Sequence, residues 1–243
     1  MKIILNGSNG RMGKEILSLI SDGYAGAELA CAVDITNTDG CKSLSEFTGE
    51  ADCIVDFTHH SVTANLLAYA TERNLPLVIA TTGHSDEEKA AIEDASKKIP
   101  VFLSANMAVG VAILVEIEKL VAKMMPDADI EIVETHHNRK VDAPSGTALM
   151  LANGLKEVRP DANFVLGRSG FGKREKNDIG IHAIRTGSVV GEHEVIIGTD
   201  AQTITLKHSS HNRAVLGEGA LRAAAFLVSK PCGIYNMNDL IKE

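Results

Sequence analysis

The sequence predicts an α/β fold, with a doubly wound parallel sheet followed by a mixed α+β region. Two observations support this prediction. Short apolar runs alternate with amphipathic helical stretches over roughly the first hundred residues. A glycine-rich turn joins the first apolar run to the first helical stretch, and this is the usual start of a dinucleotide-binding unit.

The first region contains five predicted strands. A strand is predicted at Lys2–Asn6, and an amphipathic helix follows at Arg11–Ser21. Further short apolar runs predict strands at 28–34, 52–57, 75–80 and 100–104, and further helical stretches predict helices at 61–73 and 86–98. Strands separated by helices favour a parallel sheet.

The pattern changes after Met107, where the second region begins. A helix at 110–124, a strand at 130–135 and a helix at 145–156 are predicted. Three strand-like runs at 181–190, 193–199 and 202–208 follow, and their short connections favour antiparallel neighbours. The last helix, 213–229, and the tail at 233–241 could return to the first region. We therefore expect one domain at 1–106 and 213–243, and a second at 107–212.

Composition excludes several classes of protein. The formal charge of −8 and a pI near 5.6 argue against a nucleic-acid surface. No apolar run approaches the ~20 residues that cross a membrane, and the sequence opens on a strand instead of a secretion signal, so a cytoplasmic protein is expected. The cysteines show no C-x-x-C spacing, so we expect reduced thiols at Cys31, Cys41, Cys53 and Cys232.

The turn from Gly7 to Gly13 reads G-S-N-G-R-M-G. Asn9 and Met12 replace two glycines of the strict dinucleotide motif, but Asn tolerates left-handed backbone angles. Asp34 ends the second predicted strand, where an acidic side chain accepts hydrogen bonds from an adenine ribose. The alternative is a simple tight turn beside a solvated Asp34. The order of strand, turn, helix and acid favours dinucleotide binding.

A second segment, Glu134 to Thr147, reads E-T-H-H-N-R-K-V-D-A-P-S-G-T. It gathers four titratable or cationic side chains, His136, His137, Arg139 and Lys140, ahead of a helix start at Ser145-Gly146-Thr147. Histidine exchanges protons near neutral pH, and a helix start binds anions through its N–H groups. The segment suits a small, multiply anionic substrate that is protonated as it reacts.

Alternatives for this segment remain open. Adjacent histidines at a strand end point to opposite faces, so one would face the reacting atom while the other binds or orients. A metal site could use Glu134 or Asp142, but no H-E-x-x-H or Cys/His spacing is present, and no metal is expected. A solvated polar loop is the remaining alternative.

Further landmarks complete a family resemblance. They are D-F-T at 56–58, T-T-G-H-S at 81–85, S-A-N-M at 104–107, H-H-N-R-K-V-D-A-P-S-G-T-A at 136–148, G-E-H-E at 191–194 and a terminal G-I-Y-N-M-N-D-L. With the glycine turn, they make the chain resemble the 4-hydroxy-tetrahydrodipicolinate reductase (dihydrodipicolinate reductase) family from end to end. The resemblance implies a Rossmann-like domain that binds NADH or NADPH. It also implies a central domain that binds a small cyclic dicarboxylate and builds a homotetramer.

The resemblance also implies roles for individual residues. His136 corresponds to the proton donor/acceptor and Lys140 to a proton donor, while His137, Gly146 and Thr147 correspond to substrate-binding positions, to which the helix-start motif adds Ser145. The cofactor positions are Gly7, Ser8, Asn9, Gly10, Arg11 and Met12 on the pyrophosphate, Asp34 on the ribose, and Ala80, Thr81, Thr82, Ser104, Ala105, Asn106 and Met107 around the nicotinamide.

The sequence departs from the family at two places. Ala80 stands where glycine is often found, and Thr186 interrupts a common R-G-G. Neither change removes a predicted catalytic group. Asp34 favours NADH or dual use, although Lys42 or Arg11 could reach a 2′-phosphate. Two rival functions are another nicotinamide oxidoreductase that acts on a small amino or keto acid, and a protein that senses NAD(H) without catalysis.

Overall fold

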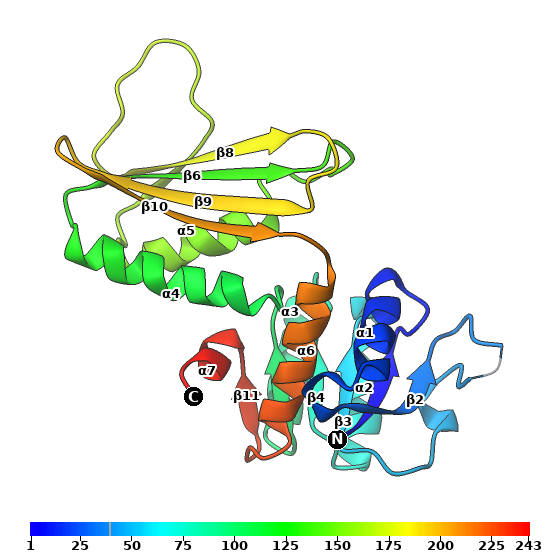
Figure 1. The fold of residues 1–243 in the computed structure, drawn as a ribbon. Coiled ribbons are helices and arrows are strands. Elements are labelled where there is room, and N and C mark those ends of the chain that lie inside the picture. The colour runs from blue at the N-terminus through cyan, green and yellow to red at the C-terminus, as the bar shows by residue number, and fades with distance from the viewer. Residues whose placement is uncertain (39) are drawn as a thin grey trace. The chain divides into compact units, whose positions relative to one another are not determined.

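The structure is a computed structural model that describes residues 1–38 and 40–243. The chain divides into two compact units. Unit 1 comprises Met1–Val109 and Arg213–Glu243, and unit 2 comprises Gly110–Asn212 (Figure 1). One unit holds a parallel sheet and the other a mixed sheet, so the predicted α/β fold class is confirmed.

Unit 1 is built on a six-stranded parallel sheet. Its strands are β1 (Lys2–Asn6), β2 (Glu28–Val33), β3 (Cys53–Asp56), β4 (Leu77–Ile79), β5 (Pro100–Leu103) and β11 (Gly233–Tyr235). They are arranged in the order β11-β5-β4-β3-β1-β2, and each neighbouring pair is parallel. The chain reverses its direction of winding at β1. Ligands of such sheets bind beyond the carboxyl ends of the strands at this reversal.

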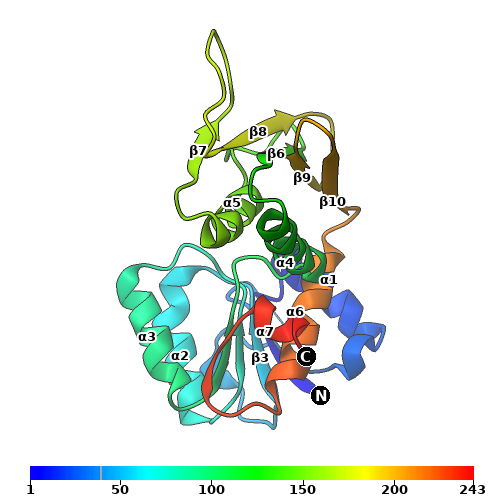
Figure 2. The same ribbon diagram turned by 90° about the vertical axis from the view of Figure 1, so that its left-hand side faces the viewer.

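Helices cover both faces of the unit 1 sheet (Figure 2). They are α1 (Arg11–Ser21) and α6 (Ala214–Leu227) on one face, and α2 (Thr63–Glu72) and α3 (Asp86–Ser96) on the other. The short elements are α7 (Met237–Ile241) and the 3₁₀ turns η1 (Tyr24–Gly26), η2 (Leu44–Glu46) and η3 (His60–Val62). Because both faces are covered, the central strands are continuous apolar runs, and all of β3 is buried.

Unit 2 is built on a five-stranded mixed sheet with two helices on one face (Figure 1). The strands are β6 (Asp129–His136), β7 (Asn163–Leu166), β8 (Asp178–Arg185), β9 (Gly191–Gly198) and β10 (Thr203–Ser210), and the helices are α4 (Val109–Met124) and α5 (Gly146–Val158). The sheet order is β10-β9-β6-β8-β7. Its core gathers apolar side chains from the helices and the central strands: Leu114, Ile130, Ile132, Leu151, Ile181, Val195 and Ile197.

The strand order in unit 2 corrects one prediction. β8 and β9 are not antiparallel neighbours, because β6 lies between them and pairs parallel with β8 and antiparallel with β9. Residues 186–190 therefore step across one strand, a span of about 10 Å that five residues can cover. Strands β7 and β11 were not predicted, since each is short and largely half-buried or exposed.

Two further observations bear on the expectations from composition. No helix in the described ranges is long and apolar enough to cross a membrane. The four cysteines are all free thiols, and Cys31 and Cys53 are buried.

One buried charge-bearing group in unit 2 stands apart from the predicted site. The side chain of Glu118 on α4 is completely buried, and neither carboxyl oxygen has a hydrogen-bond partner among the described residues. Burial raises the pKa of Glu118 to about 9, although the nearby charge of Lys119 opposes the shift. The carboxyl group of Glu118 is therefore neutral at pH 7. It packs closely against Gly154 on α5, where an added Cβ would lie 3.2 Å from Oε1 of Glu118.

Glu118 should make the stability of the protein fall as the pH rises. The unfolded chain releases this proton near the ordinary pKa of 4.5 and the folded chain only near 9, so between these values alkali favours unfolding. We expect the free energy of unfolding of the wild type to fall, relative to Glu118→Gln, by up to about 1.4 kcal/mol per pH unit. Urea titrations at pH 5, 7 and 9 measure this, with exposed Glu15→Gln as the control. Parallel curves for the wild type and Glu118→Gln would contradict the assignment.

Candidate functional site

A cavity of about 1010 Å³ opens at the carboxyl ends of β1, β2 and β3 in unit 1. This is the reversal point of the sheet, where a ligand is expected. Four of the predicted cofactor residues line it: Gly7, Asn9, Gly10 and Asp34. The lining also includes Asn6, Thr36, Lys42, Phe57, Thr58 and His59. The cavity has the size of a cofactor site.

The backbone of the glycine turn packs closely against neighbouring carbonyl groups at this cavity. Gly7 has a φ of +89°, and a Cβ on it would lie 2.7 Å from the carbonyl oxygen of Phe57. A Cβ on Gly13 would lie 2.2 Å from the carbonyl oxygen of Gly7. Helix α1 begins at Arg11, and the residue before it, Gly10, has no side chain to cap it. The buried hydroxyl of Ser8 has no hydrogen-bond partner within the described chain. Uncapped N–H groups and an unused hydroxyl fit a pyrophosphate.

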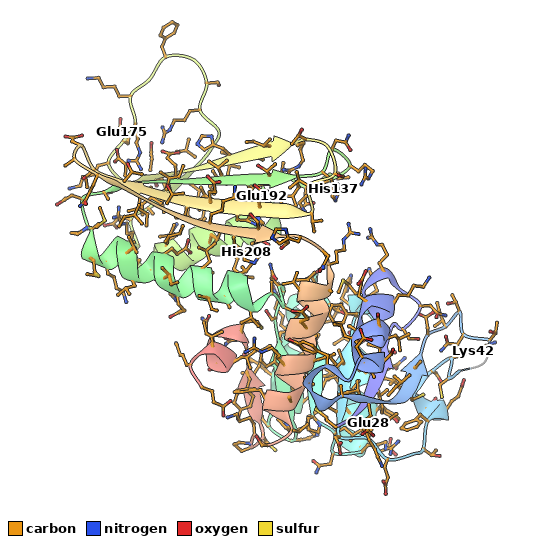
Figure 3. The ribbon with its side chains drawn as sticks, viewed as in Figure 1. Glu28, Lys42, His137, Glu175, Glu192 and His208 are labelled. Atoms are coloured by element: carbon orange, nitrogen blue, oxygen red, sulfur yellow. The ribbon has the colours of Figure 1, made fainter. Side chains whose placement is uncertain are left out.

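Asp34 follows β2 and is tied to the glycine turn. Its carboxylate accepts hydrogen bonds from the N–H of Asn9 at 3.1 Å and from the N–H and hydroxyl of Thr36 at 2.9 and 2.7 Å. Burial would raise the pKa of Asp34, but the bonds from Thr36 and Asn9 lower it. An ionised carboxylate therefore lies in the same cavity as Lys42, which Figure 3 shows on the loop after β2.

The predicted nicotinamide residues lie at the ends of the next two strands. Ala80, Thr81 and Thr82 follow β4, and Ser104, Ala105, Asn106 and Met107 follow β5. They lie outside the lining of the cavity, as do Ser8, Arg11 and Met12. Ser104 and Asn106 brace their turn, since the Ser104 hydroxyl donates to the carbonyl of Asn106.

Sequence reasoning missed Asp56, which connects the end of β1 with the segments that follow β3 and β4. Its buried carboxylate accepts hydrogen bonds from Thr81 at 2.6 Å, Thr58 at 2.7 Å and Asn6 at 2.8 Å. Burial raises the pKa of Asp56 despite these bonds. The D-F-T landmark contains this residue, but its partner Thr81 is far along the chain.

The candidate catalytic centre of unit 2 is arranged around a buried carboxylate. Glu134 on β6 is completely buried, and its Oε2 lies 2.5 Å from Nδ1 of His136. Arg185 donates to both carboxylate oxygens at 2.8 Å, and the N–H of Ser145 donates to Oε1 at 3.0 Å. Burial would raise the pKa of Glu134, but the bonds from Arg185, His136 and Ser145 lower it. The carboxylate is therefore ionised at neutral pH.

Ser145 caps the start of α5 and is held from two sides. Its hydroxyl accepts the N–H of Ala148 at 3.2 Å and lies 3.0 Å from Nε2 of His193 on β9. Burial, with a smaller contribution from the neighbouring His136, lowers the pKa of His193 to about 4. His193 is therefore neutral at pH 7, and its ring lies edge-on to that of His136 with centroids 5.1 Å apart.

The other predicted residues of this centre lie nearby on the same loop and helix. Lys140 is mostly buried and pairs with Asp142 at 2.9 Å. Gly146 and Thr147 form the first turn of α5, and Gly146 is exposed. His136 is the last residue of β6, and His137 lies just beyond its end (Figure 3). No cluster of three or more metal-binding side chains is found in residues 1–38 and 40–243.

Sequence reasoning did not identify Arg185 or His193 as members of this centre. Arg185 lies 51 residues from Glu134 and reaches it only because β8 pairs with β6. His193 belongs to the G-E-H-E landmark, but its partner Ser145 lies 48 residues away. The landmark was the one available signal for His193.

Comparisons with known proteins agree over the whole chain. Residues 1–107 match the family model described as dihydrodipicolinate reductase, N-terminus, and residues 110–241 match the one described as dihydrodipicolinate reductase, C-terminus. The chain is 44% identical over 250 residues to the 4-hydroxy-tetrahydrodipicolinate reductase of Caldanaerobacter subterraneus subsp. tengcongensis, covering 100% of the chain and 99% of that protein. It is 43% identical over 250 residues to the enzyme of the same name from Clostridium tetani, covering 100% and 98%.

Solved structures with a similar fold include two enzymes. A dipicolinate-bound dihydrodipicolinate reductase from Paenisporosarcina sp. TG-14 has a TM-score of 0.78 at 24% identity and covers 97% of each chain. An amine dehydrogenase from Mycobacterium smegmatis has a TM-score of 0.65 at 10% identity, with 98% of this chain and 95% of that chain covered. At these identities, the likeness establishes the fold alone.

The crowding at Gly13 gives a test of the cofactor cavity. In Gly13→Ala the new methyl group would lie 2.2 Å from the carbonyl oxygen of Gly7 and 2.5 Å from that of Ser8, so the turn must shift. We expect NADH to bind at least about tenfold more weakly, a loss of about 1.4 kcal/mol. Fluorescence titration measures the affinity, and Gly172→Ala, where a Cβ meets no atom within 4 Å, is the control. Unchanged NADH binding would remove the turn from the cofactor site.

Proposed function

Because the chain belongs to the dihydrodipicolinate reductase family, we propose that its reaction, the NAD(P)H-dependent reduction of 4-hydroxy-tetrahydrodipicolinate in diaminopimelate and lysine biosynthesis, takes place at the Glu134–His136–Ser145 centre of unit 2. The substrate is a cyclic imine with two carboxylates. Its 4-hydroxyl leaves as water, and a hydride and a proton are added to the ring. The bound NAD(P)H supplies the hydride.

His136 is the proposed proton donor. Hydride addition at ring carbon 4 moves electrons toward the ring nitrogen, and a proton must then reach the ring. A positioned acid accelerates such a step by roughly 100- to 10,000-fold. The observation that carries the proposal is that His136 and the capped start of α5 share one carboxylate, Glu134, so an acid and an anion-binding helix start lie in one network.

The substrate carboxylates would be held by groups around this acid. The N–H groups of Gly146 and Thr147 lie in the first turn of α5, where the helix dipole favours an anion. Lys140 is paired with Asp142 and would exchange this partner for a substrate carboxylate, with His137 on the same loop. Lys140 would also stabilise charge as it develops.

The cofactor would be held by unit 1. The turn residues Gly7, Ser8 and Gly10 suit the pyrophosphate, and Asp34 suits the adenine ribose. Ala80 to Thr82 and Ser104 to Met107, at the ends of β4 and β5, are proposed for the nicotinamide. These assignments give unit 1 the dinucleotide and unit 2 the substrate.

We further propose a cytoplasmic homotetramer. The face of the unit 2 sheet opposite α4 and α5 carries apolar side chains on neighbouring strands, among them Val133, Ile184 and Ile196, and Ile184 is 45% exposed. The same face also carries Glu131, His182 and Glu194. Apolar side chains on a sheet face that α4 and α5 do not cover support an association surface with a mixed polar and apolar character. Light scattering of the purified protein measures the assembly.

Replacement of the proposed proton donor should affect catalysis far more than cofactor binding. His136→Gln and Lys140→Ala should each lower kcat and kcat/KM, by roughly 100-fold or more for His136, because an interaction made in the transition state is lost. Oxidation of NADH in the presence of freshly generated substrate measures this, alongside NADH titration. His182→Gln is the control, since its ring bonds Glu131 instead. Wild-type kcat in a folded His136→Gln protein would reject the assignment.

Cofactor choice should follow the charges in the unit 1 cavity. Asp34 repels a 2′-phosphate, so NADH should bind at least as well as NADPH, while Lys42 in the same cavity limits the preference. Titration of both cofactors at low and high salt measures it. Lys42→Ala should weaken NADPH and leave NADH unchanged. A strong NADPH preference that fades as salt rises would mean that a cation outweighs Asp34.

A further inference from the structure

We propose that Glu134 is a positioning residue that makes Nε2 of His136 the proton-transferring atom, with Arg185 fixing the carboxylate and Gly191 keeping Nε2 open. This inference rests on the proposed role of His136. It gives a role in catalysis to three residues to which the sequence analysis had assigned none.

The carboxylate fixes which nitrogen of His136 carries the constant proton. Oε2 of Glu134 lies 2.5 Å from Nδ1, and an ionised carboxylate can only accept a hydrogen bond. Nδ1 must therefore be protonated whenever this bond is made. The exchangeable proton of His136 is then the one on Nε2, which is present in the imidazolium and absent in the neutral ring.

Arg185 prevents the carboxylate from turning away from His136. It donates to both oxygens of Glu134 at 2.8 Å, and it also donates to the carbonyl of Asp142 at 2.6 Å. The guanidinium plane therefore sets the plane of the carboxylate. The same contacts join the end of β8 to the loop that carries Lys140.

The N–H of Ser145 gives Glu134 a second task. This N–H donates to Oε1 at 3.0 Å, on the oxygen that does not contact His136. One carboxylate thus sets the distance between the acid and the start of α5. A shift of Glu134 would move both the proton donor and the proposed carboxylate site.

Gly191 on β9 leaves space at the other side of the ring. A Cβ at this position would lie 3.0 Å from Nε2 of His136 and 3.4 Å from Cδ2. Any larger residue would press against the nitrogen that must reach the substrate. The absence of a side chain at Gly191 is therefore a requirement of the proposed proton transfer, in a strand where glycine otherwise weakens the sheet.

The first experiment compares Glu134→Gln with Glu131→Gln. Glu131 lies on the same strand, and its carboxylate also contacts a histidine, His182, at 2.8 Å, together with two arginines. Both variants lose an anion among cations, but only Glu134→Gln changes the group that faces His136. Arg185 and the N–H of Ser145 both donate at the Oε1 position and hold the amide oxygen there, so the amide nitrogen faces Nδ1 and donates to it. Glu131→Gln should keep the wild-type kcat profile.

The first readout is the histidine tautomer, which does not depend on activity. In ¹⁵N-histidine spectra, with the His136 signal identified by its loss in His136→Gln, the wild-type neutral ring should carry its proton on Nδ1. In Glu134→Gln the Nε2–H form should appear. If Glu134→Gln retains the wild-type Nδ1–H form, the proposal is overturned, whatever the activity of the variant.

The second readout is the dependence of kcat on pH. Without its anion the imidazolium is less stable, so the alkaline limb of kcat should move to lower pH in Glu134→Gln. At pH 8, kcat should fall roughly 100-fold, with partial recovery in acid and unchanged NADH affinity. A loss of kcat that is equal at every pH would mean a merely structural role and would overturn the proposal.

A second variant covers the case in which Glu134→Gln does not fold. Gly191→Ala keeps the Glu134 network and adds one methyl group beside Nε2, so kcat should fall at least tenfold while the Nδ1–H tautomer remains. Gly198→Ala on the same strand is the control, where the nearest atom to a Cβ is Oγ1 of Thr203 at 3.3 Å. Wild-type kcat in Gly191→Ala would overturn the role of Nε2.

The two levels of proposal fail in different ways. If the wild type oxidises neither NADH nor NADPH with the substrate, the proposed function is rejected. If His136→Gln is fully active, the proton-donor role of His136 is rejected, and the positioning role of Glu134 is rejected with it. If His136→Gln is inactive while Glu134→Gln matches the wild type in tautomer and in pH profile, the positioning role alone is rejected.

Discussion

The buried carboxylate of Glu134 is the constraint on which the candidate catalytic centre depends. A charge that is completely removed from water is costly unless it is paired and hydrogen-bonded. Arg185, His136 and the N–H of Ser145 together satisfy both oxygens, and they come from three separate segments. Loss of any one partner would leave part of the negative charge of Glu134 buried without a compensating hydrogen bond or cation. The carboxylate therefore holds the strand end, the helix start and the end of β8 in one arrangement.

Glu134 and His193 are both buried in this centre, but they are in different charge states. Glu134 stays ionised because cations and N–H groups surround it, whereas His193 is neutral because burial and His136 lower its pKa to about 4. A neutral His193 does not compete with His136 for the negative charge of Glu134. It is instead free to share a hydrogen bond with the hydroxyl of Ser145. The centre thus places the ring of His136 next to one ionised carboxylate.

Unit 1 uses a buried carboxylate for a comparable purpose. Asp56 at the end of β3 accepts hydrogen bonds from the last residue of β1 and from a residue after β4, and both strands are its neighbours in the sheet. Parallel strands bring their carboxyl ends to one edge, so a single acceptor can fix several loops there. Asp34, which follows β2 on the other side of β1, likewise accepts a hydrogen bond from the glycine turn. The unit 1 cavity is lined by residues of the segments that these two carboxylates connect.

The sequence by itself determined the features that depend on neighbours along the chain. Periodicity predicted β1, α1 and the long helix α4 nearly to the residue, and the turn at Gly7 and the segment around His136 were visible as local patterns. Residues joined across the sheets were not, because strand pairing depends on non-local contacts that no local pattern encodes. The insertion of β6 between β8 and β9 is one example, and it is what carries Arg185 to Glu134. Gly191 is another example, because a Cβ at this position would lie 3.0 Å from Nε2 of His136, and the sequence does not show that the two residues are close. The sequence thus predicted His136 and the helix start as site residues, and only the tertiary structure showed that one carboxylate, Glu134, contacts both.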